Sequence, residues 1–406
     1  MDKNIHSYDQ SYFASCSLGL EEVLSKELQS FGAKKVTITR GGAEFKGDSP
    51  AISAILNSRV ASRILKKVCS FGAPDEKALY RNALQVKWSD VFDADLTFKI
   101  QSIISNQVFK NSIYLSQLFK DAVVDSFRKT TGKRPNVNIN SPDISLILRA
   151  ERTSTALTKV SIYADLCGRP LHERGYRINN GPAPLKENLA AGILLVSEWN
   201  NNSDTFIDTM CGAGTFLMEA ALIKYDIPPS FLRLRSKELW AMQKYNFFKK
   251  NADLRTMFDA ELKNCKEKAV KGMEKAKSGS ANIFGFDINK VAVSGAKENI
   301  MLAGFGSVIK IEQGDATTIA SPNNTPGPGS IVLCNPPYGE RLGDKEKLDQ
   351  LYYQYGENLK NNFKGYSAVI FTGNFDSARQ ISLKPQYKTP LFNGKIECRA
   401  FRYPLY

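Results

Sequence analysis

The sequence is poor in the residues that hold metal ions and disulfide frameworks. Its 406 residues include seven cysteines and two histidines, and the cysteines are scattered without a Cys-x-x-Cys pair. Structural zinc sites need a closely spaced set of cysteine and histidine ligands, and small secreted proteins depend on dense cysteines. We therefore predict a reduced, cytoplasmic protein with no metal site.

Long apolar segments are also missing. No run of about 18 apolar residues occurs, so the sequence predicts no membrane-spanning helix. Residues 1–7 are polar and lack the apolar centre of a secretory signal. The sequence nowhere has the Gly-Lys-Ser or Gly-Lys-Thr of a nucleoside triphosphate loop. These absences argue against a membrane protein, a secreted protein and an ATP-dependent enzyme.

Positive charge, in contrast, is in excess. Lysine and arginine number 55 against 41 aspartates and glutamates, a formal net charge of +14 at pH 7. Such a balance favours a polyanionic partner, and a nucleic acid is the partner we expect. Charge alone leaves open the alternative of a basic enzyme without such a partner.

The N-terminal part of the chain has the mixed pattern of an α+β region. Strands are predicted over residues 12–16, 35–39, 96–100, 144–150 and 155–163, and helices over 18–31, 51–69, 74–86 and 112–130. Basic residues gather near the end of the predicted 51–69 helix, which is typical of a solvated helix face. No constellation of acid, base or nucleophile stands out, so we interpret this region as a binding module.

Residues 204–406 alternate strands and helices, as a doubly wound parallel sheet requires. The predicted strands are residues 205–208, 283–287, 309–313, 331–334 and 367–371, with a C-terminal pair near 391 and 399–403. The connection between the first two strands is unusually long and is rich in lysine, aromatic residues and helix formers. It indicates an inserted helical segment, because long loops without secondary structure are uncommon in compact domains.

The strand at residues 331–334 stops abruptly at Asn335-Pro336-Pro337-Tyr338. Neither proline has an N–H group, so the sheet cannot continue there. Open α/β sheets bind ligands just beyond the carboxyl ends of their strands. Asn335 and Pro336 each offer a carbonyl oxygen to a planar NH2 group, and Tyr338 offers a flat face to its ring. Taken alone, the motif also fits an ordinary turn.

Three aspartates end the preceding strands. Asp208 opens a loop that contains Gly212 and Gly214, where the missing Cβ atoms allow a tight turn and a close ligand. Asp287 is placed to accept the two hydroxyls of a ribose, and Asp315 to accept an adenine amino group. Each acid alone is more often a helix N-cap. Their recurrence at successive strand ends favours a nucleoside cofactor.

Together these motifs resemble the class I S-adenosylmethionine-dependent methyltransferases that act on amino groups. More closely, the chain resembles the bacterial THUMP-domain RNA methyltransferases of the RlmL-like kind, which include the large-subunit rRNA guanine-N2 methyltransferase. The resemblance extends over almost the whole chain. It is carried by residues 133–137 (Lys-Arg-Pro-Asn-Val), 171–177 (Leu-His-Glu-Arg-Gly-Tyr-Arg), 183–190 (Ala-Pro-Leu-Lys-Glu-Asn-Leu-Ala), 208–215 (Asp-Thr-Met-Cys-Gly-Ala-Gly-Thr) and 335–342 (Asn-Pro-Pro-Tyr-Gly-Glu-Arg-Leu).

The resemblance implies an α/β fold in which a class I, Rossmann-like methyltransferase domain has a doubly wound seven-stranded sheet. Two α+β domains, ferredoxin-like and THUMP, are expected to precede it. We place the ferredoxin-like domain at residues 1–60, the THUMP RNA-binding domain at 61–165 and the methyltransferase domain at 166–406, with the helical insertion at about 225–280.

The resemblance also implies S-adenosylmethionine as the cofactor, with its methionine part at the Asp208 loop, its ribose on Asp287 and its adenine on Asp315. The other implied cofactor-binding residues are Lys186, Glu187, Cys211, Gly212, Gly214, Thr215, Ile288, Ala316 and Asn335. The implied catalytic residues are Asn335, Pro336, Pro337 and Tyr338, with the tyrosine stacked on a flipped base. The implied RNA-binding residues are Lys133, Arg134, Arg174 and Arg177.

Two residues depart from the pattern of the family. Thr209 stands where the family usually has proline, and Ala213 where it usually has serine. The first change alters the stiffness of the loop, and the second removes a hydroxyl group. Because both glycines and the three aspartates remain, we expect the chain to bind the cofactor.

The expected reaction is methyl transfer to guanine N2 of 23S rRNA. The Asn-Pro-Pro-Tyr motif serves several kinds of amine, so N2-guanine methylation of tRNA and N6-adenine methylation of DNA remain alternatives. The separate α+β head favours RNA over DNA. A third reading is a non-enzymatic RNA-binding or assembly factor, against which the intact motifs argue.

Overall fold

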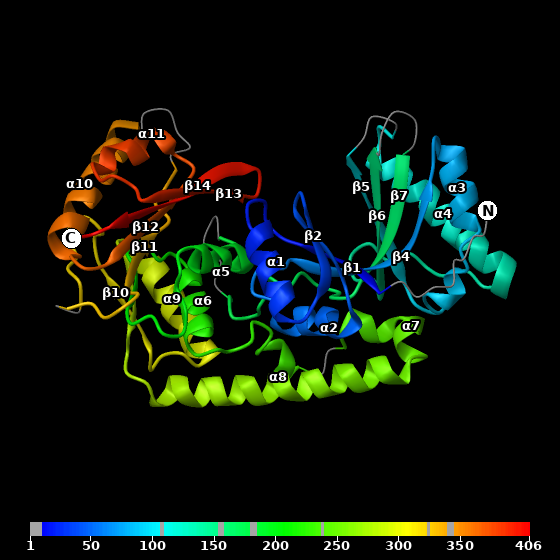
Figure 1. Ribbon diagram of the computed structural model, residues 1–406, viewed down its shortest axis with the longest axis horizontal. Coiled ribbons are helices and arrows are strands. Elements are labelled where there is room, and N and C mark those ends of the chain that lie inside the picture. Colours follow the sequence, from blue (N-terminus) through cyan, green and yellow to red (C-terminus); the bar gives the residue numbers. More distant parts are fainter. Residues whose placement is uncertain are drawn as a thin grey trace.

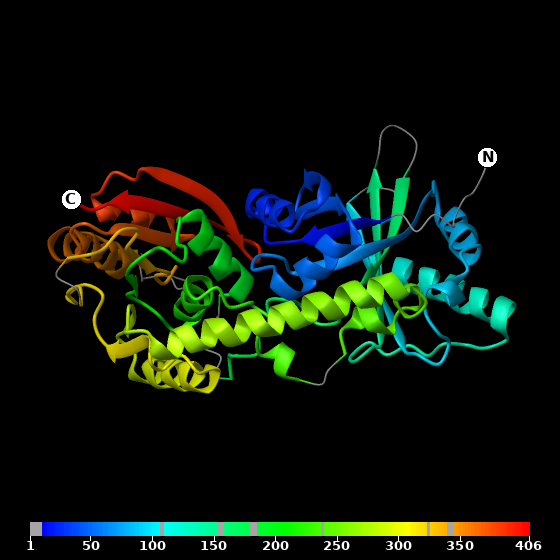
Figure 2. The ribbon, with the colours of Figure 1, turned by 60° about the horizontal axis from the view of Figure 1, so that its bottom comes forward.

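The computed structural model describes residues 10–105, 109–152, 158–178, 185–236, 239–322, 325–338 and 345–406. Within these ranges, two seven-stranded sheets lie next to each other along the long axis of the molecule (Figure 1). The N-terminal sheet occupies the centre and right of that view, and the C-terminal sheet occupies the left. A long helix runs along the bottom of both halves, and Figure 2 turns it to the front.

The N-terminal sheet has the strand order β2-β3-β1-β4-β7-β6-β5. Its strands are β1 (Ser11–Ser15), β2 (Lys34–Thr39), β3 (Gly42–Lys46), β4 (Arg63–Gly72), β5 (Phe98–Ser105), β6 (Ile144–Arg152) and β7 (Thr158–Asp165). Only β5 and β6 are parallel neighbours among these strands. β4 pairs with β1 on one side and β7 on the other, so one sheet joins the two predicted α+β domains.

The alternation of side chains along β1 gives this sheet two different faces. Tyr12 and Ala14 belong to the main core, whereas Phe13 joins a small separate cluster on the opposite face. The helices of this part are α1 (Glu21–Ser30), α2 (Asp48–Asn57), α3 (Glu76–Leu84) and α4 (Ser112–Thr131). The main core therefore lies between these helices and one face of the sheet.

The helix predicted over residues 51–69 is wrong in its second half. The helix α2 ends at Asn57, and β4 begins at Arg63. β4 gains backbone hydrogen bonds along both edges, and this pairing outweighs the local helical spacing. Its basic residues are therefore not on a solvated helix face: Arg63 forms an ion pair with Asp165, and Lys66 is buried.

The C-terminal sheet has the strand order β10-β9-β8-β11-β12-β14-β13. Its strands are β8 (Phe206–Asp208), β9 (Ile283–Asp287), β10 (Ile309–Gln313), β11 (Ile331–Cys334), β12 (Ser367–Thr372), β13 (Tyr387–Asn393) and β14 (Ile396–Pro404). The five strands from β10 to β12 are parallel, and β14 runs antiparallel to both of its neighbours, β12 and β13. This confirms the predicted doubly wound seven-stranded sheet. Its order reverses between β8 and β11, and ligands bind at such a switch point.

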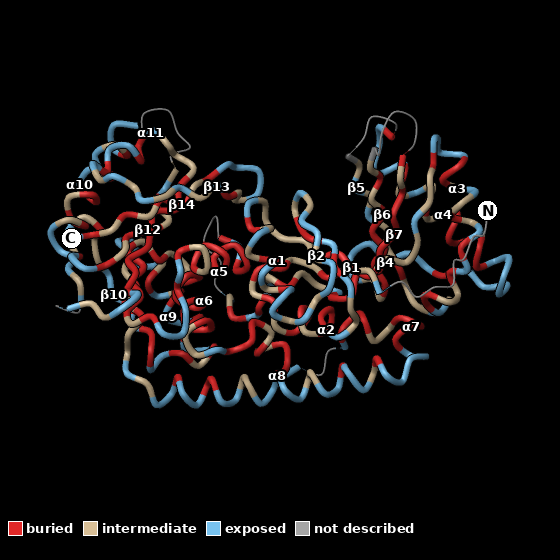
Figure 3. Tube along the Cα trace, viewed as in Figure 1, coloured by how far each residue is buried: buried red, intermediate tan, exposed pale blue. Residues whose placement is uncertain are grey.

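Helices flank this sheet and fill the long connection between β8 and β9. The flanking helices are α5 (Glu187–Val196), α6 (Thr215–Lys224), α9 (Lys290–Ala303), α10 (Lys345–Asn362) and α11 (Phe375–Ala378). The connection contains α7 (Asn246–Lys249) and α8 (Ala252–Ser278). The 27-residue helix α8 contacts α2, where the Asn57 side-chain amide donates to Glu261 over 2.8 Å. Helix α8 is buried along the side that faces the rest of the molecule and exposed along its outer side (Figure 3). The connection therefore holds the N-terminal half against the C-terminal half.

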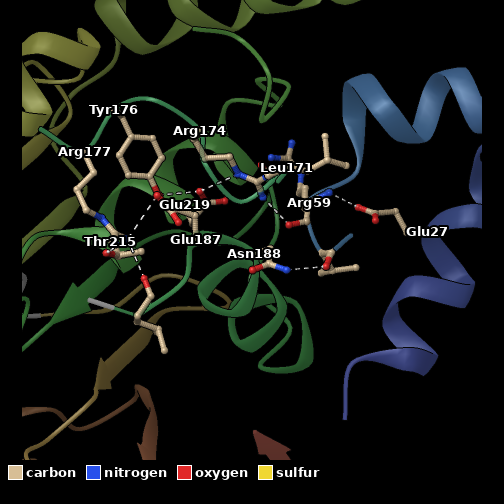
Figure 4. Close-up of polar contacts among 12 residues, drawn as sticks. Glu27, Arg59, Leu171, Arg174, Tyr176, Arg177, Glu187, Asn188, Thr215 and Glu219 are labelled. Carbon is tan, nitrogen blue, oxygen red and sulfur yellow. Dashed lines mark hydrogen bonds and ion pairs between the residues drawn. The ribbon is translucent and has the colours of Figure 1, made fainter. Parts of the chain in front are cut away.

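A buried polar network joins the two halves directly (Figure 4). Arg174 is only 3% exposed, and its guanidinium group donates to the carbonyl of Leu171 over 2.6 Å and to that of Arg59 over 2.5 Å. Its Nε lies 3.4 Å from Oε1 of Glu219, which is fully buried on α6. The hydroxyl of Tyr176 donates to the same carboxylate oxygen over 2.8 Å.

The side chains of two further residues strengthen this junction. Glu27 of α1 accepts a hydrogen bond of 2.7 Å from the backbone N–H of Arg59. Asn188 of α5 is fully buried, and its side-chain amide donates to the carbonyl of Val60 and to the hydroxyl of Ser62. The segment between α2 and β4 is thus held by side chains from both halves.

The substitution Arg174→Met should strongly destabilise the protein. It leaves the buried carboxylate of Glu219 without its cation, which costs about 3–5 kcal/mol in the free energy of unfolding. Equilibrium urea unfolding, followed by circular dichroism, measures this change. Arg379→Met is the matched control, because its ion pair with Asp376 is exposed and should contribute less than about 1 kcal/mol. Equal costs for the two variants would contradict this account.

Candidate functional site

A cavity of about 670 Å³ lies beyond the carboxyl ends of the parallel strands, at the switch point of the sheet. Many of the residues that the sequence analysis selected line this cavity. The predicted residues that line it are Asp208, Cys211, Gly212, Thr215, Asp287, Ile288, Asp315, Ala316, Asn335 and Pro337. The predicted residues Lys186, Glu187, Gly214, Pro336 and Tyr338 are not part of its lining.

The loop between β8 and α6 forms the floor of the cavity. Gly212 and Gly214 have φ values of +50° and +80°, a left-handed conformation that glycine adopts without strain. The backbone N–H of Cys211 donates to the carbonyl of Phe286 over 2.8 Å. The carbonyl of Ala213 accepts from the buried side chain of Asn299 over 3.3 Å. The loop is therefore fixed to β9 and α9 before any ligand binds.

Thr209 gives this loop a further anchor. Its hydroxyl shares a hydrogen bond of 2.8 Å with the hydroxyl of Tyr355 on α10, and both residues are buried. Its backbone N–H donates to the carbonyl of Leu333 on β11 over 3.0 Å. A proline could make neither contact, because it has no hydroxyl and no N–H. Thr209 thus holds the loop through hydrogen bonds, where proline would restrict the backbone.

The three aspartates differ in their surroundings. Asp208 is 1% exposed, and burial raises its pKa to about 8. Asp287 accepts a hydrogen bond of 2.9 Å from the backbone N–H of Gly212 on Oδ2 and one of 2.9 Å from that of Asn289 on Oδ1. These two bonds fix the direction of its carboxylate. Asp208, in contrast, is kept mainly neutral at pH 7 by its burial.

Asp315 is oriented by its own turn. Its Oδ1 accepts from the backbone N–H and from the hydroxyl of Thr317, over 2.8 and 2.7 Å. Both residues line the cavity. The local turn therefore fixes the carboxylate at the β10 end of the cavity, the place where the sequence analysis expects the adenine.

Asn335 and Tyr338 contact each other at the end of β11. The hydroxyl of Tyr338 donates to Oδ1 of Asn335 over 2.7 Å, and the thiol of Cys398 lies 3.7 Å from the same hydroxyl. Burial raises the pKa of Tyr338, so the phenol keeps its proton. Asn335 lines the cavity, whereas the tyrosine lies beside it. The neighbouring motif residues 339–342, like residues 183–184, lie outside the part of the chain that the structure describes.

One wall of the cavity was missed by the sequence analysis. It is made by α10, which contributes the residues Lys347, Gln350, Leu351 and Gln354. The spacing of these residues is that of one helix face, so the helical period offered a signal. Leu185 and Met210 also line the cavity and were not selected.

The two arginines that were expected to bind RNA lie inside the protein. Arg174 is buried in the network between the two halves. The side chain of Arg177 is 9% exposed, and its Nη2 lies 3.6 Å from the buried carboxylate of Glu187. The structure therefore gives neither guanidinium group a surface on which to contact RNA. Their predicted RNA-binding role is corrected to an internal one.

The other two expected RNA-binding residues are on the surface. Lys133 and Arg134 follow α4 in an exposed loop. Nζ of Lys133 lies 3.3 Å from Asp95, and both side chains are more than half exposed. Such a pair is weak and leaves the lysine able to exchange partners.

The described residues contain neither a cluster of metal ligands nor a helix that could span a membrane. Within these ranges no group of three or more histidine, cysteine, aspartate or glutamate side chains is arranged to hold a metal ion. Nor does any helix found there have the length and apolar character needed to cross a membrane.

Three segments of the chain match the models of known protein domains. Residues 11–65 match the model of the RlmL ferredoxin-like domain, residues 73–158 that of the THUMP domain, and residues 174–402 that of the RMKL-like methyltransferase domain. The crystal structure of SMU.472 complexed with SAH has a TM-score of 0.82 and 25% identity, and the match covers 98% of this chain and 99% of that one.

Similar curated proteins carry the name ribosomal RNA large subunit methyltransferase K/L. The protein of Syntrophotalea carbinolica is 33% identical over 398 residues, which are 97% of this chain and 53% of the relative. The protein of Methylococcus capsulatus is 35% identical over 401 residues, which are 98% of this chain and 51% of the relative. The chain therefore spans about half the length of these relatives.

The substitution Thr209→Val should destabilise the loop. It removes one partner of the buried hydrogen bond with Tyr355 while keeping the shape of the side chain, at a cost of about 1–3 kcal/mol. Urea unfolding of Thr209→Val, Tyr355→Phe and the double variant measures the coupling. If the hydroxyl pair is the cause, the double variant should lose less than the sum of the two single losses. Additive losses would mean that the two hydroxyls act separately.

Asp208 should make the protein less stable as the pH rises. Its folded pKa of about 8 exceeds that of an exposed aspartate, about 4, so folding takes up a proton between these values. The free energy of unfolding then falls by up to about 1.4 kcal/mol per pH unit. In Asp208→Asn this titration is absent, so the stability of the variant relative to wild type should increase from about pH 5 to 8 and then level off. Urea unfolding across this range measures it, and a constant difference would contradict a neutral Asp208.

Proposed function

Because the chain belongs to the RMKL-like methyltransferase family, we propose that it transfers a methyl group from S-adenosylmethionine to the exocyclic N2 amine of a guanine in 23S rRNA. The observation that carries this proposal is the position of Asn335. It lines the same cavity as the glycine loop and the aspartates Asp287 and Asp315. A side chain that can accept hydrogen bonds from an amine and a set of residues that can bind a nucleoside thus line the same cavity.

The cavity fits the cofactor in size and in chemistry. Its volume of about 670 Å³ is ordinary for a small-molecule site. The left-handed Gly212 lies at the floor, where an added Cβ would meet nothing of the protein within 4 Å and would stand in the ligand space. Asp287 and Asp315 would hold the ribose and the adenine through their oriented carboxylates. The bound cofactor would supply a methyl group on a sulfonium, which is an excellent leaving group.

Asn335 would hold the target amine. A carbonyl oxygen has two lone pairs, and the hydroxyl of Tyr338 uses one of those on Oδ1. The second lone pair remains for an N–H of the base. The carbonyl of Pro336 would accept the other N–H of the amine. These two acceptors would fix the amine in line with the methyl group, so that positioning provides most of the rate enhancement.

The side chains around the cavity suit a reaction without a strong base. Cys211 lines the cavity, but burial and the nearby Asp208 and Asp287 raise the pKa of its thiol. The thiol therefore stays protonated at neutral pH. Proton loss from the methylated amine needs no strong base, because the product cation is acidic enough to lose its proton to water.

Three observations support RNA as the substrate. The chain carries a match to the THUMP domain, it has a net charge of +14, and its curated relatives are named ribosomal RNA methyltransferases. Lys133 and Arg134 lie exposed in the THUMP region and would contact the phosphate backbone. A substrate of this kind would place the protein in the cytoplasm.

The experiment that tests the proposal uses radiolabelled S-adenosylmethionine with four substrates. These are 23S rRNA from a strain that lacks the gene, 23S rRNA from the parent strain, bulk tRNA and unmethylated DNA. Digestion to nucleosides should give labelled N2-methylguanosine only from the 23S rRNA of the deletion strain. Label in tRNA would change the substrate, and label in N6-methyladenine would overturn the proposed base. The absence of label in all four samples would favour a binding protein.

The substitution Asn335→Ala should reduce methyl transfer at least about a hundredfold, because the target amine loses its oriented acceptor. Binding of S-adenosylhomocysteine, measured by calorimetry without RNA, should change by less than about twofold. Asn201→Ala, at an exposed turn, is the matched control and should leave both quantities unchanged. Loss of S-adenosylhomocysteine binding in Asn335→Ala would assign Asn335 to the cofactor site.

A further inference from the structure

Arg177 lies next to the cavity and contacts two of the residues that line it. Its Nη2 donates to the carbonyl of Leu185 over 2.7 Å and to the hydroxyl of Thr215 over 3.0 Å (Figure 4). Leu185 and Thr215 both line the cavity, whereas Arg177 does not. A single nitrogen atom therefore connects two cavity residues that are 30 positions apart in the sequence (215 − 185 = 30).

The two acceptors belong to the starts of two helices. Leu185 stands just before the N-cap of α5, which is Lys186, and Thr215 is the first residue of α6. Thr215 also ends the glycine loop that forms the floor of the cavity. Because the carbonyl and the hydroxyl accept from the same atom, a change in the position of Arg177 changes the separation of the two helix starts.

Arg177 is itself held firmly. Its Nη2 lies 3.6 Å from Oε1 of Glu187, and both side chains are more than nine-tenths buried. On one side of it in the sequence, Tyr176 is bonded to Glu219. On the other side, the backbone N–H of Ile178 donates to Oδ1 of Asn299 over 3.0 Å. The three consecutive residues are thus fixed to α5, α6 and α9, and Arg177 has little freedom to move.

Asn299 extends this support to the glycine loop. Its Oδ1 accepts from Ile178, and its Nδ2 donates to the carbonyl of Ala213. The segment that carries Arg177 and the loop that carries Gly212 and Gly214 therefore share one buried asparagine. The same segment is thus linked to the cavity floor at Ala213 through Asn299, and to Leu185 and Thr215 through Arg177.

From this geometry we propose that Arg177 is a positioning residue for the methionine end of the cofactor site, acting through Thr215 and Leu185. This inference rests on the proposed function, because it requires that S-adenosylmethionine binds in the cavity. It replaces the RNA-contacting role that the sequence suggested for this arginine. Arg177 sets the distance between the starts of α5 and α6 without contacting the ligand.

The test is a double-mutant cycle on ligand binding. The dissociation constant of S-adenosylhomocysteine is measured by calorimetry on the full chain, without RNA, for wild type, Arg177→Met, Thr215→Val and the double variant. Arg177→Met should weaken binding about tenfold, since a hydrogen bond from a charged donor is lost. The double variant should bind about as well as the weaker single variant, because both changes remove the same contact.

Control variants distinguish a positioning role of Arg177 from a general loss of stability. Arg233→Lys changes another buried arginine, which donates to the carbonyl of Cys167 and does not line the cavity, and it should alter the dissociation constant by less than about twofold. Thr215→Ser keeps the hydroxyl and should restore most of the binding that Thr215→Val loses. At saturating cofactor, Arg177→Met should keep its kcat and its affinity for RNA, while the KM for S-adenosylmethionine rises.

The outcomes distinguish this inference from the proposed function. If wild type does not bind S-adenosylhomocysteine, the proposed function fails. If wild type binds and Arg177→Met binds equally well, or if the two single effects simply add, the positioning role is overturned. A weaker affinity for RNA with an unchanged KM for the cofactor would also overturn it. If Arg177→Met does not fold, Arg177→Lys takes its place in the cycle, and the same criteria apply.

Discussion

The buried ion pair between Arg174 and Glu219 is the interaction on which the arrangement of the two halves depends. Removing both charges from water is costly, so the pair depends on the hydrogen bonds that Arg174 donates to two carbonyls and that Tyr176 donates to the carboxylate. Arg174 reaches the carbonyl of Arg59 in the N-terminal half, and Glu219 sits on α6 of the C-terminal half. Since α6 also begins at the floor of the cavity, the constraint that joins the halves also fixes one end of the site.

The sheet aligns the remaining parts of the site. In the parallel pairing, Asp208 lies opposite Gly285 on one side and Leu333 on the other, so β8 ends two residues before β9 (287 − 285 = 2) and one residue before β11 (334 − 333 = 1). The residues that follow these ends therefore meet above the sheet, although they come from positions more than 120 apart in the sequence (335 − 208 = 127). A short buried strand with an abrupt end is thus sufficient to place Asn335 beside the glycine loop.

Much of the C-terminal half could be predicted because its signals are local. Buried strands that end in glycine, aspartate or proline predicted the sheet, and the same strand ends predicted the cavity and the family. The failures came from contacts between distant residues. The second half of the 51–69 helix became β4 because two other strands pair with it. Arg174 and Arg177 seemed to be surface cations because the buried Glu219 and Glu187 that pair with them could not be inferred from spacing.

Tyr338, which the sequence analysis expects to stack on a base, is bonded to Asn335 in this structure. Its hydroxyl is bonded to Oδ1 of Asn335 and lies near the thiol of Cys398, and its ring does not line the cavity. To stack on a base in the cavity, the tyrosine would have to give up both contacts. The loss would also free the lone pair of Asn335 that the tyrosine hydroxyl occupies. Stacking on the base and fixing the asparagine are therefore competing uses of one side chain, and the structure shows the second.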